Sequence, residues 1–342
     1  MIQHVRLKWL IAILVLALPA AAADAAIVID TVAVGNVGNA GELSGAGAGG
    51  FGPNLVCGAV GYAYNIGTYE VTAGQYRDFL NAVDPTGANT NHLYNAYMDT
   101  NQYGCQITWN SVLSTYDFSG GSGTAADWEN RPVNYVSWYD ALRFANWLHN
   151  GQGSSDTEDG AYDMSLGASV VRELGATWVL PTEDEWYKAA YHKNDGDTGN
   201  YFDYPTGSDT VPSNVLNDGG NNATFYDVGY TIGSPYYRTE FGAHENSDSP
   251  YGTFDQGGNV WEWNEANIYG DGSHRGLRGG SFGDYDSSLQ ASYRSAGFNA
   301  PSSEYYYVGF RVASSAAIPE PGSVLVWAGL GIIGLFWWRR RR

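Results

Sequence analysis

Turn-forming residues interrupt this chain so often that long helices and wide regular sheets are excluded over most of its length. Glycine occurs 45 times in 342 residues, and beyond Tyr191 glycine, asparagine, aspartate or serine recurs every few positions. These residues favour turns because they tolerate left-handed backbone or bond their own backbone. The 26 tyrosines and 12 tryptophans bury large apolar areas. The sequence therefore predicts a loop-rich fold held together by aromatic packing, not a helix bundle.

The charge balance is strongly acidic, with a formal net charge of −19. Six of the 17 basic residues lie near the two ends, at Arg6, Lys8 and residues 339–342, so the part between them is more acidic still. Such a surface repels nucleic acid, and we expect no nucleic-acid partner. It suits divalent cations, basic partners or simple solubility.

The N-terminus has the pattern of a secretory signal. Basic residues precede an apolar run, which ends at Pro19 and is followed by small residues. This order is typical of a cleavable signal peptide, here residues 1–26. The mature chain then begins with a Gly-rich segment, residues 27–57, in which residues 27–34 are predicted as a strand and residues 35–52 as a flexible loop.

The C-terminus carries a second targeting pattern. Pro319, Glu320 and Pro321 precede an apolar stretch and four terminal arginines. Residues 323–338 are at the lower limit of length for a transmembrane helix, and the arginines favour the cytoplasmic side. The pattern resembles the PEP-CTERM sorting signal of exopolysaccharide-producing Gram-negative bacteria. The resemblance implies that residues 318–342 anchor the chain in the inner membrane until an exosortase-type enzyme cuts the tail. The domain would then reside at the cell surface or in the extracellular matrix, and a permanent single-pass anchor is the alternative.

Three helices are predicted from a capping residue followed by apolar residues at helical spacing. They begin at Thr72, Ser137 and Thr182, whose hydroxyls accept hydrogen bonds from the first free N–H groups of a helix. Glu185, three residues after Thr182, completes a capping box. Each helix carries its apolar residues on one face, which we expect to be buried.

Six short motifs follow one another between Val60 and Ala313. They lie at residues 69–72 with 79–83, 131–133 with 137–138, 180–186, 258–263, 278–282 and 308–312. In order and spacing they resemble the motifs of the formylglycine-generating-enzyme, or sulfatase-modifying-factor, family. The resemblance implies that residues 58–314 form an α+β domain with that family's fold. This fold is related to C-type lectins and has few regular elements and many ordered loops.

A calcium site is predicted between residues 255 and 262. Two carboxylates flank a glycine pair there, and calcium takes about six to eight oxygen ligands, including carboxylates and carbonyls. The resemblance implies side-chain oxygens from Asp255 and Glu262 and backbone oxygens from Gly258 and Val260. A second family site would fall on Asn214 and Val215, with Asp227 as a weaker candidate. The alternative is that both carboxylates only cap turns.

The family's catalytic pair is missing from this sequence. The family oxidises a sulfatase cysteine to formylglycine with two cysteines that bind copper(I). The first corresponds to Asp284 and the second to Ser288 or Leu289, so copper is not expected, because copper(I) requires soft thiolate ligands. Tyr307 replaces an asparagine expected before the last motif. Other positions near the family's active site are retained, namely Asn259, Trp261 and Ser281.

Cys57 and Cys105 are the chain's two cysteines, and after export they form a candidate disulfide. The scattered histidines and the absence of a nucleophile-elbow motif give no support to another chemistry. The leading hypothesis is an exported, calcium-stabilised binding or structural module, with an exopolysaccharide or a cell-surface protein as partner. The consecutive tyrosines at residues 305–307 suit carbohydrate stacking, or alternatively form a half-buried strand. The second hypothesis is a formylglycine-type oxidase or another enzyme that uses the same pocket.

Overall fold

The computed structural model describes residues 26–118, 123–216, 219–295, 297 and 299–314. Short helices and strands alternate with longer connecting loops, as the density of turn residues predicts. The α-helices are α1 (Ala73–Val83), α2 (Tyr97–Thr100), α3 (Ala125–Glu129), α4 (Trp138–His149) and α5 (Glu183–Tyr191). The 3₁₀ helices are η1 (Ala46–Ala48), η2 (Met164–Ser169) and η3 (Asp286–Leu289).

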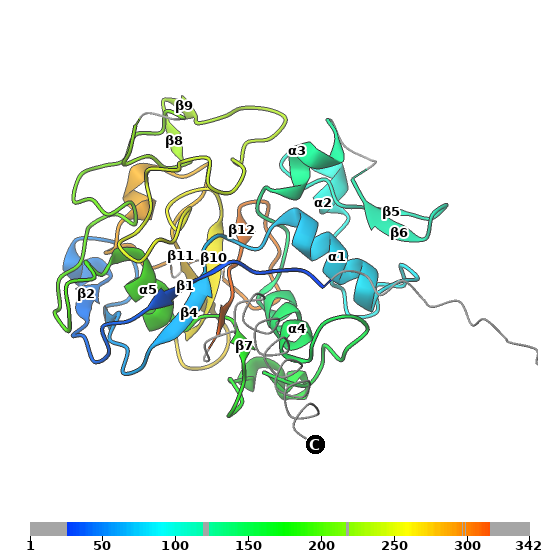
Figure 1. Ribbon diagram of the computed structural model, residues 1–342, viewed down its shortest axis with the longest axis horizontal. Coiled ribbons are helices and arrows are strands. Elements are labelled where there is room, and N and C mark those ends of the chain that lie inside the picture. The colour runs from blue at the N-terminus through cyan, green and yellow to red at the C-terminus, as the bar shows by residue number, and fades with distance from the viewer. Residues whose placement is uncertain (1–25, 119–122, 217–218, 296, 298, 315–342) are drawn as a thin grey trace, which may run out of the picture.

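The strands form small sheets rather than one continuous sheet. A four-stranded sheet has the order β1-β4-β13-β7, and a three-stranded sheet has the order β11-β10-β12 (Figure 1). Pairs β2-β3, β5-β6 and β8-β9 stand apart from these sheets. The strands are β1 (Thr31–Val34), β2 (Glu42–Ser44), β3 (Leu55–Cys57), β4 (Tyr64–Gly67), β5 (Thr108–Asn110), β6 (Thr115–Asp117), β7 (Trp178–Val179), β8 (Tyr226–Asp227), β9 (Gly229–Tyr230), β10 (Trp261–Asn267), β11 (Arg275–Arg278), β12 (Val308–Gly309) and β13 (Ala313–Ser314). This mixture of helices and small sheets confirms the α+β, loop-rich prediction.

The three predicted helix starts are confirmed by capping boxes. Thr72, Ser137 and Thr182 are the N-caps of α1, α4 and α5, and each accepts a hydrogen bond from the third helical residue. In each case the side chain of that residue bonds back to the N-cap. The local sequence therefore determines where these helices begin.

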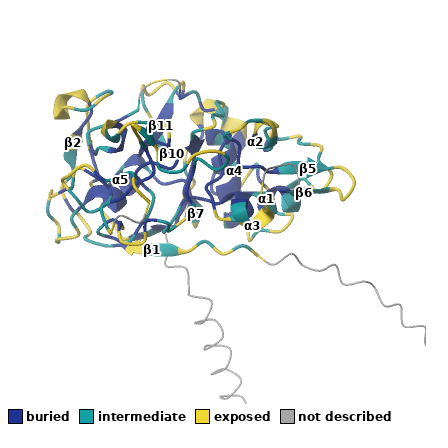
Figure 2. Cartoon of the chain, turned by 90° about the horizontal axis from the view of Figure 1, so that it is seen from above, coloured by how far each residue is buried: buried dark blue, intermediate teal, exposed yellow. Residues whose placement is uncertain are grey.

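Aromatic side chains fill the interior, as their abundance predicts. Trp128, Trp138, Trp186 and Trp263 are almost completely buried, and each contributes roughly 4–6 kcal/mol of apolar transfer free energy. Buried residues occupy the centre of the molecule, and exposed ones mark the outer loops (Figure 2). Packing of these rings compensates for the small amount of regular secondary structure.

The Gly-rich N-terminal segment is an ordered part of the same domain. Strand β1 pairs with β4 in the four-stranded sheet, which confirms part of the strand predicted at residues 27–34. The flexible loop predicted at residues 35–52 is wrong, because β2 within it pairs with β3. Gly45 has φ 104°, and a Cβ there would lie 2.5 Å from the carbonyl oxygen of Pro53. Glycine serves close packing here rather than flexibility.

The two predicted targeting segments fall outside the described residues, apart from Ala26. This applies to the signal at residues 1–26 and to the tail at residues 318–342, including the transmembrane helix expected at 323–338. Among the helices of the described ranges, none combines the length and apolar character needed to cross a membrane.

The buried cap of α4 makes stability depend on pH. Asp140 accepts hydrogen bonds from the backbone and the hydroxyl of Ser137. Burial, and then the neighbouring Glu304 carboxyl, raises the pKa of Asp140 to about 7, whereas an unfolded aspartate titrates near ~4. Because the pKa of Asp140 is higher in the folded state than in the unfolded state, protonation of Asp140 stabilises the fold. This contribution is complete below the unfolded pKa and is lost as the pH rises through the folded pKa.

We therefore expect the free energy of unfolding to fall between about pH 4 and about pH 7, by a magnitude on the order of a few kcal/mol. Asp140→Asn, which retains an acceptor for the cap, should flatten this dependence. Urea unfolding across this pH range measures both effects. Stability that rises with pH, or an unchanged slope in the variant, would contradict this assignment.

Candidate functional site

A half-buried carboxylate, Asp284, lies at the centre of the candidate site. Its Oδ2 atom accepts three hydrogen bonds, from the Ser281 backbone N–H (3.1 Å), the Ser281 hydroxyl (2.5 Å) and Trp261 Nε1 (2.8 Å). No hydrogen bond to Oδ1 is present among the described residues. One oxygen is thus fixed by protein donors, while the other remains available to a ligand.

The backbone before Ser281 explains how this arrangement forms. Gly279 and Gly280 have φ values of 99° and 76°, a region that favours glycine. A Cβ at Gly279 would lie 2.5 Å from the carbonyl oxygen of Gln256. The glycine pair therefore turns the chain tightly after β11 and places Ser281 beside Trp261 at the start of β10.

Of the three predicted pocket residues, two donate hydrogen bonds to Asp284, and the third stabilises the adjacent turn without contacting Asp284. Trp261 and Ser281 donate directly to the carboxylate. Asn259 is fully buried, its Oδ1 accepts from the Thr239 backbone N–H, and its carbonyl oxygen accepts from Phe282 N–H. Asn259 therefore holds the turn next to Asp284 without reaching it.

Tyr306 and Tyr307 lie near Asp284 and belong to a contiguous group of aromatic rings, most of them partly exposed, that we call the tyrosine patch. Stacked rings of Tyr103 and Tyr306 have their centroids 4.8 Å apart, and Tyr285 is 62% exposed. Burial, and then Tyr103 and the Asp284 carboxylate, raises the pKa of Tyr306. The patch consists of Tyr103, Tyr226, Tyr230, Tyr237, Phe282, Tyr285, Tyr306 and Tyr307, linked by ring contacts of 4.6–6.2 Å.

Two buried polar side chains hold the patch in place. Asn134 donates from Nδ2 to the carbonyl oxygens of Tyr103 (2.7 Å) and Tyr306 (2.5 Å), and so ties the stacked pair together. The fully buried Arg238 also donates to the Tyr103 carbonyl. Sequence reasoning missed both, because their partners are distant in sequence and neither belongs to a recognisable pattern.

The two positions predicted to correspond to the family's second cysteine are buried. Ser288 and Leu289 lie in η3, and Leu289 packs with Tyr204 and Phe225 in a small core cluster. A Cβ at Gly280 would lie 2.9 Å from Leu289 Cδ1, so this segment packs against the turn that carries Ser281. No sulfur atom is present at Asp284, Ser288 or Leu289.

The candidate disulfide is not formed. Cys57 and Cys105 are both free and buried, and they belong to separate core clusters. Burial raises the pKa of Cys57 to about 12, so its thiol stays protonated and unreactive. These two thiols pack as core residues.

The predicted calcium loop contains a buried ion pair. Glu262 is fully buried, and its two oxygens each lie 2.6 Å from a guanidinium nitrogen of Arg311. Trp186 Nε1 also donates to Glu262, at 2.7 Å. Asp255 accepts from the Gly242 N–H at 3.2 Å, and burial raises the pKa of Asp255 to about 6.

The two predicted backbone ligands of this loop, Gly258 and Val260, are tightly packed. Gly258 approaches Thr224 so closely that a Cβ would lie 2.1 Å from its carbonyl oxygen, and Val260 is fully buried. Across the part of the chain that the structure describes, no group of three or more His, Cys, Asp or Glu side chains is arranged to hold a metal. Calcium binding by this loop stays a prediction, and no contact here tests it.

The second predicted calcium site holds a hydrogen-bonded turn. Asn214 donates from Nδ2 to the carbonyl oxygens of Phe225, Asp227 and Gly229, at 3.3, 3.4 and 2.9 Å. The Val215 N–H donates to the Ser213 hydroxyl. The Asn214 amide therefore stabilises the β8-β9 pair as a donor.

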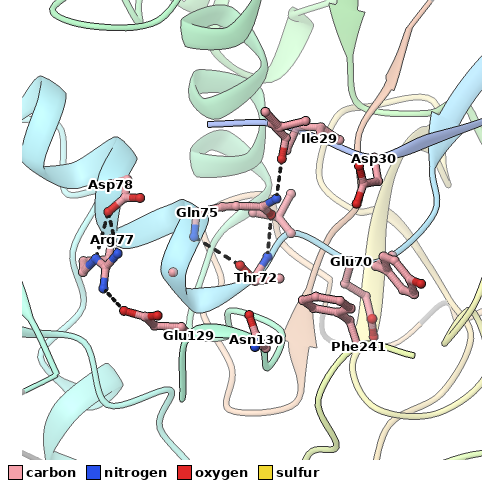
Figure 3. Close-up of a pocket in the computed structure, with 14 residues that line it drawn as sticks. Ile29, Asp30, Glu70, Thr72, Gln75, Arg77, Asp78, Glu129, Asn130 and Phe241 are labelled. Carbon is pink, nitrogen blue, oxygen red and sulfur yellow. Dashed lines mark hydrogen bonds and ion pairs between the residues drawn. The ribbon is translucent and has the colours of Figure 1, made fainter. Parts of the chain in front are cut away.

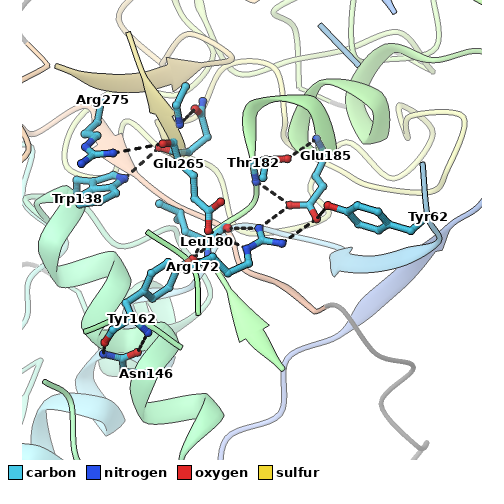
Figure 4. A network of polar contacts seen from close by, with 12 residues as sticks. Tyr62, Trp138, Asn146, Tyr162, Arg172, Leu180, Thr182, Glu185, Glu265 and Arg275 are labelled. Atoms are coloured by element: carbon cyan, nitrogen blue, oxygen red, sulfur yellow. Dashed lines mark hydrogen bonds and ion pairs between the residues drawn. The ribbon is translucent and has the colours of Figure 1, made fainter. Parts of the chain in front are cut away.

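Three buried arginines are paired with carboxylates, namely Arg278, Arg294 and Arg311. Glu183 accepts from both Arg278 and Arg294, and all three are buried. A further cluster, not predicted, joins Arg172 to Glu185 and Glu265 at 2.8 and 2.9 Å (Figure 4). These clusters lock α5 to β10 and β11 and are structural.

Comparison with known families assigns the domain. Residues 59–316 match the sulfatase-modifying factor enzyme 1-like domain, and residues 317–342 match the PEP-CTERM protein-sorting motif. The chain therefore belongs to the sulfatase-modifying-factor family, with that family's α+β fold, and carries a tail typical of exported proteins processed by exosortase-type machinery.

The chain is also similar, at low sequence identity, to several solved structures. Treponema denticola variable protein 1 is 21% identical, with TM-score 0.48, over 84% of this chain and 95% of its own. CarF is 20% identical, with TM-score 0.44, over 84% and 98%. PvdO from Pseudomonas aeruginosa is 18% identical, with TM-score 0.41, over 84% and 92%. No curated protein matches the sequence.

Proposed function

We propose that this exported domain is a non-catalytic binding module, and that Asp284 and the tyrosine patch bind a carbohydrate. The observation that supports this most is the Asp284 carboxylate, fixed through one oxygen and lying near partly exposed aromatic rings. A sugar ring offers an apolar C–H face to an aromatic ring and hydroxyl donors to a carboxylate. The aromatic rings and the carboxylate that such a ligand requires are both present on one surface.

The site residues do not fit the family's redox chemistry. Copper(I) requires thiolate ligands, whereas Asp284 offers a hard carboxylate oxygen and both thiols of the chain are buried elsewhere. An oxidase remains the second hypothesis only through family membership, and no described contact favours it.

Calcium is a separate part of the proposal. The Arg311 guanidinium already supplies the positive charge beside Glu262, so the binding surface does not depend on an ion there. Calcium at Asp255 and the neighbouring carbonyl oxygens would add stability to the loop.

The glycan that suits this surface is neutral or basic. With a net charge of −19, the chain repels anionic polysaccharides. An array of neutral, basic and anionic oligosaccharides, followed by calorimetry on the best ligand, tests this choice directly.

We expect Tyr306→Ala and Asp284→Asn each to weaken binding of that ligand at least about tenfold, or ~1.4 kcal/mol. Tyr269→Ala, which changes an exposed tyrosine of the β10-β11 loop outside the tyrosine patch, is the matched control and should leave affinity unchanged. An empty array, or equal losses in all three variants, would leave the domain without its proposed ligand.

A further inference from the structure

A cavity of about 310 Å³ lies between the N-terminal strand and the start of α1, and it shares no residue with the tyrosine patch. Residues 28–30 form one wall, and residues 69–72 with the first turns of α1 form another (Figure 3). Glu129, Asn130 and Phe241 complete the lining. The cavity is large enough to hold a side chain or a small organic molecule.

Its lining is acidic and incompletely neutralised. Arg77, its one cationic lining residue among the described residues, is already paired with Asp78 (2.8 Å) and Glu129 (2.7 Å). Asp30 and Glu70 have no ion-pair partner within the described part of the chain. Asp30, Asp78 and Glu129 outnumber Arg77, so the lining has an excess of negative charge that favours a cationic ligand. Burial, and then the Asp255 carboxylate, raises the pKa of Glu70, and a bound cation would favour its charged form.

Glu70 is the most informative residue in this cavity. Its side chain is 97% buried, since only 3% of the residue is exposed, and its Oε1 atom has no hydrogen-bond partner among the described residues. Leaving a buried carboxyl oxygen without a donor costs roughly 1–3 kcal/mol. A ligand that brings an N–H donor would recover part of that free energy.

Aromatic rings complete the recognition chemistry. Tyr69 and Phe241 both line the cavity, with ring centroids 4.7 Å apart, and Phe254 stacks on Tyr69 at 5.5 Å. An organic cation gains cation–π attraction from such rings and charge pairing from the carboxylates. A metal ion gains nothing from the rings, and no metal-holding group of three ligating side chains exists among the described residues.

We propose that this cavity binds an organic monocation, an alkylammonium or guanidinium group, held by the Glu70 and Asp30 carboxylates and by the rings of Tyr69 and Phe241. The group belongs either to a free amine or to a basic side chain of a partner. Both sources present the same chemistry to the cavity.

Calorimetry on the purified exported chain tests the proposal with n-butylguanidinium, n-butylammonium and neutral n-butanol as probes. At least one of the two cations is expected to bind with a Kd below about 1 mM, and n-butanol is expected not to bind at about 10 mM. A Gly-Lys-Gly and a Gly-Arg-Gly peptide form the second arm: tighter binding of a peptide than of the free cation indicates a partner's side chain, and weaker binding indicates a free amine.

Glu70→Gln and Asp30→Asn should each weaken cation binding at least about tenfold. Asp30 is exposed, so its variant keeps the test valid if Glu70→Gln does not fold. Glu173→Gln, an exposed carboxylate outside the cavity, is the control and should change nothing. Equal binding of n-butanol, no binding of either cation, binding of calcium alone, or full affinity in Asp30→Asn would overturn the proposal.

Discussion

Glu262→Ala should lower the free energy of unfolding by about 3–5 kcal/mol, the usual cost of breaking a buried ion pair by removing one partner. Arg311 is fully buried and would lose both of its charge-assisted hydrogen bonds. Its remaining bonds go to the carbonyl oxygens of Gly67 (2.9 Å), Thr68 (3.4 Å) and Phe254 (3.0 Å) and do not neutralise its charge. Trp186 Nε1 would also lose its acceptor. Urea unfolding followed by circular dichroism measures the loss.

The exposed pair of Lys193 and Asp209 is the control for this measurement. Their charged atoms lie 3.0 Å apart, but both side chains reach solvent, so Asp209→Ala should cost no more than about 1 kcal/mol. A loss for Glu262→Ala as small as that of the control would contradict the ion-pair account. A large drop in the wild-type melting temperature on adding a chelator would show that calcium, not Arg311 alone, compensates Glu262.

Local features of the fold were predictable from the sequence. The capping boxes at Thr72, Ser137 and Thr182 involve residues only three positions apart, so the helix starts could be predicted without tertiary information. The ordered series of motifs likewise indicated the family and its α+β fold. The prediction of a flexible loop at residues 35–52 was wrong because glycine content indicates only that the backbone can adopt many conformations. Close packing against other segments of the chain fixes one of those conformations.

The partners of the site residues were not predictable from the sequence. Glu262 was predicted as a calcium ligand, and no local pattern indicated that Arg311, 49 residues away, bonds to both of its oxygens. The tyrosine patch draws rings from segments around residues 103, 230, 285 and 306, so the run at residues 305–307 revealed only part of it. Long-range contacts of this kind depend on the folded chain and leave no local pattern.

Copper and oxygen distinguish the binding module from the oxidase most directly. Asp284 Oδ2 is held by Ser281 and Trp261, and a carboxylate oxygen is a hard ligand that does not retain copper(I). Cys57 and Cys105 are buried in separate clusters, and burial raises the pKa of both thiols, so neither offers a thiolate. The wild-type chain should therefore have no high-affinity copper(I) site at Asp284.

The decisive measurement is a copper(I) competition titration of the wild-type chain, followed by incubation with oxygen and a cysteine-containing sulfatase peptide. Our account predicts that the chain removes no copper from the competing chelator and leaves the peptide thiol unchanged. One bound copper per chain, together with oxygen-dependent conversion of the peptide cysteine to an aldehyde, would contradict it.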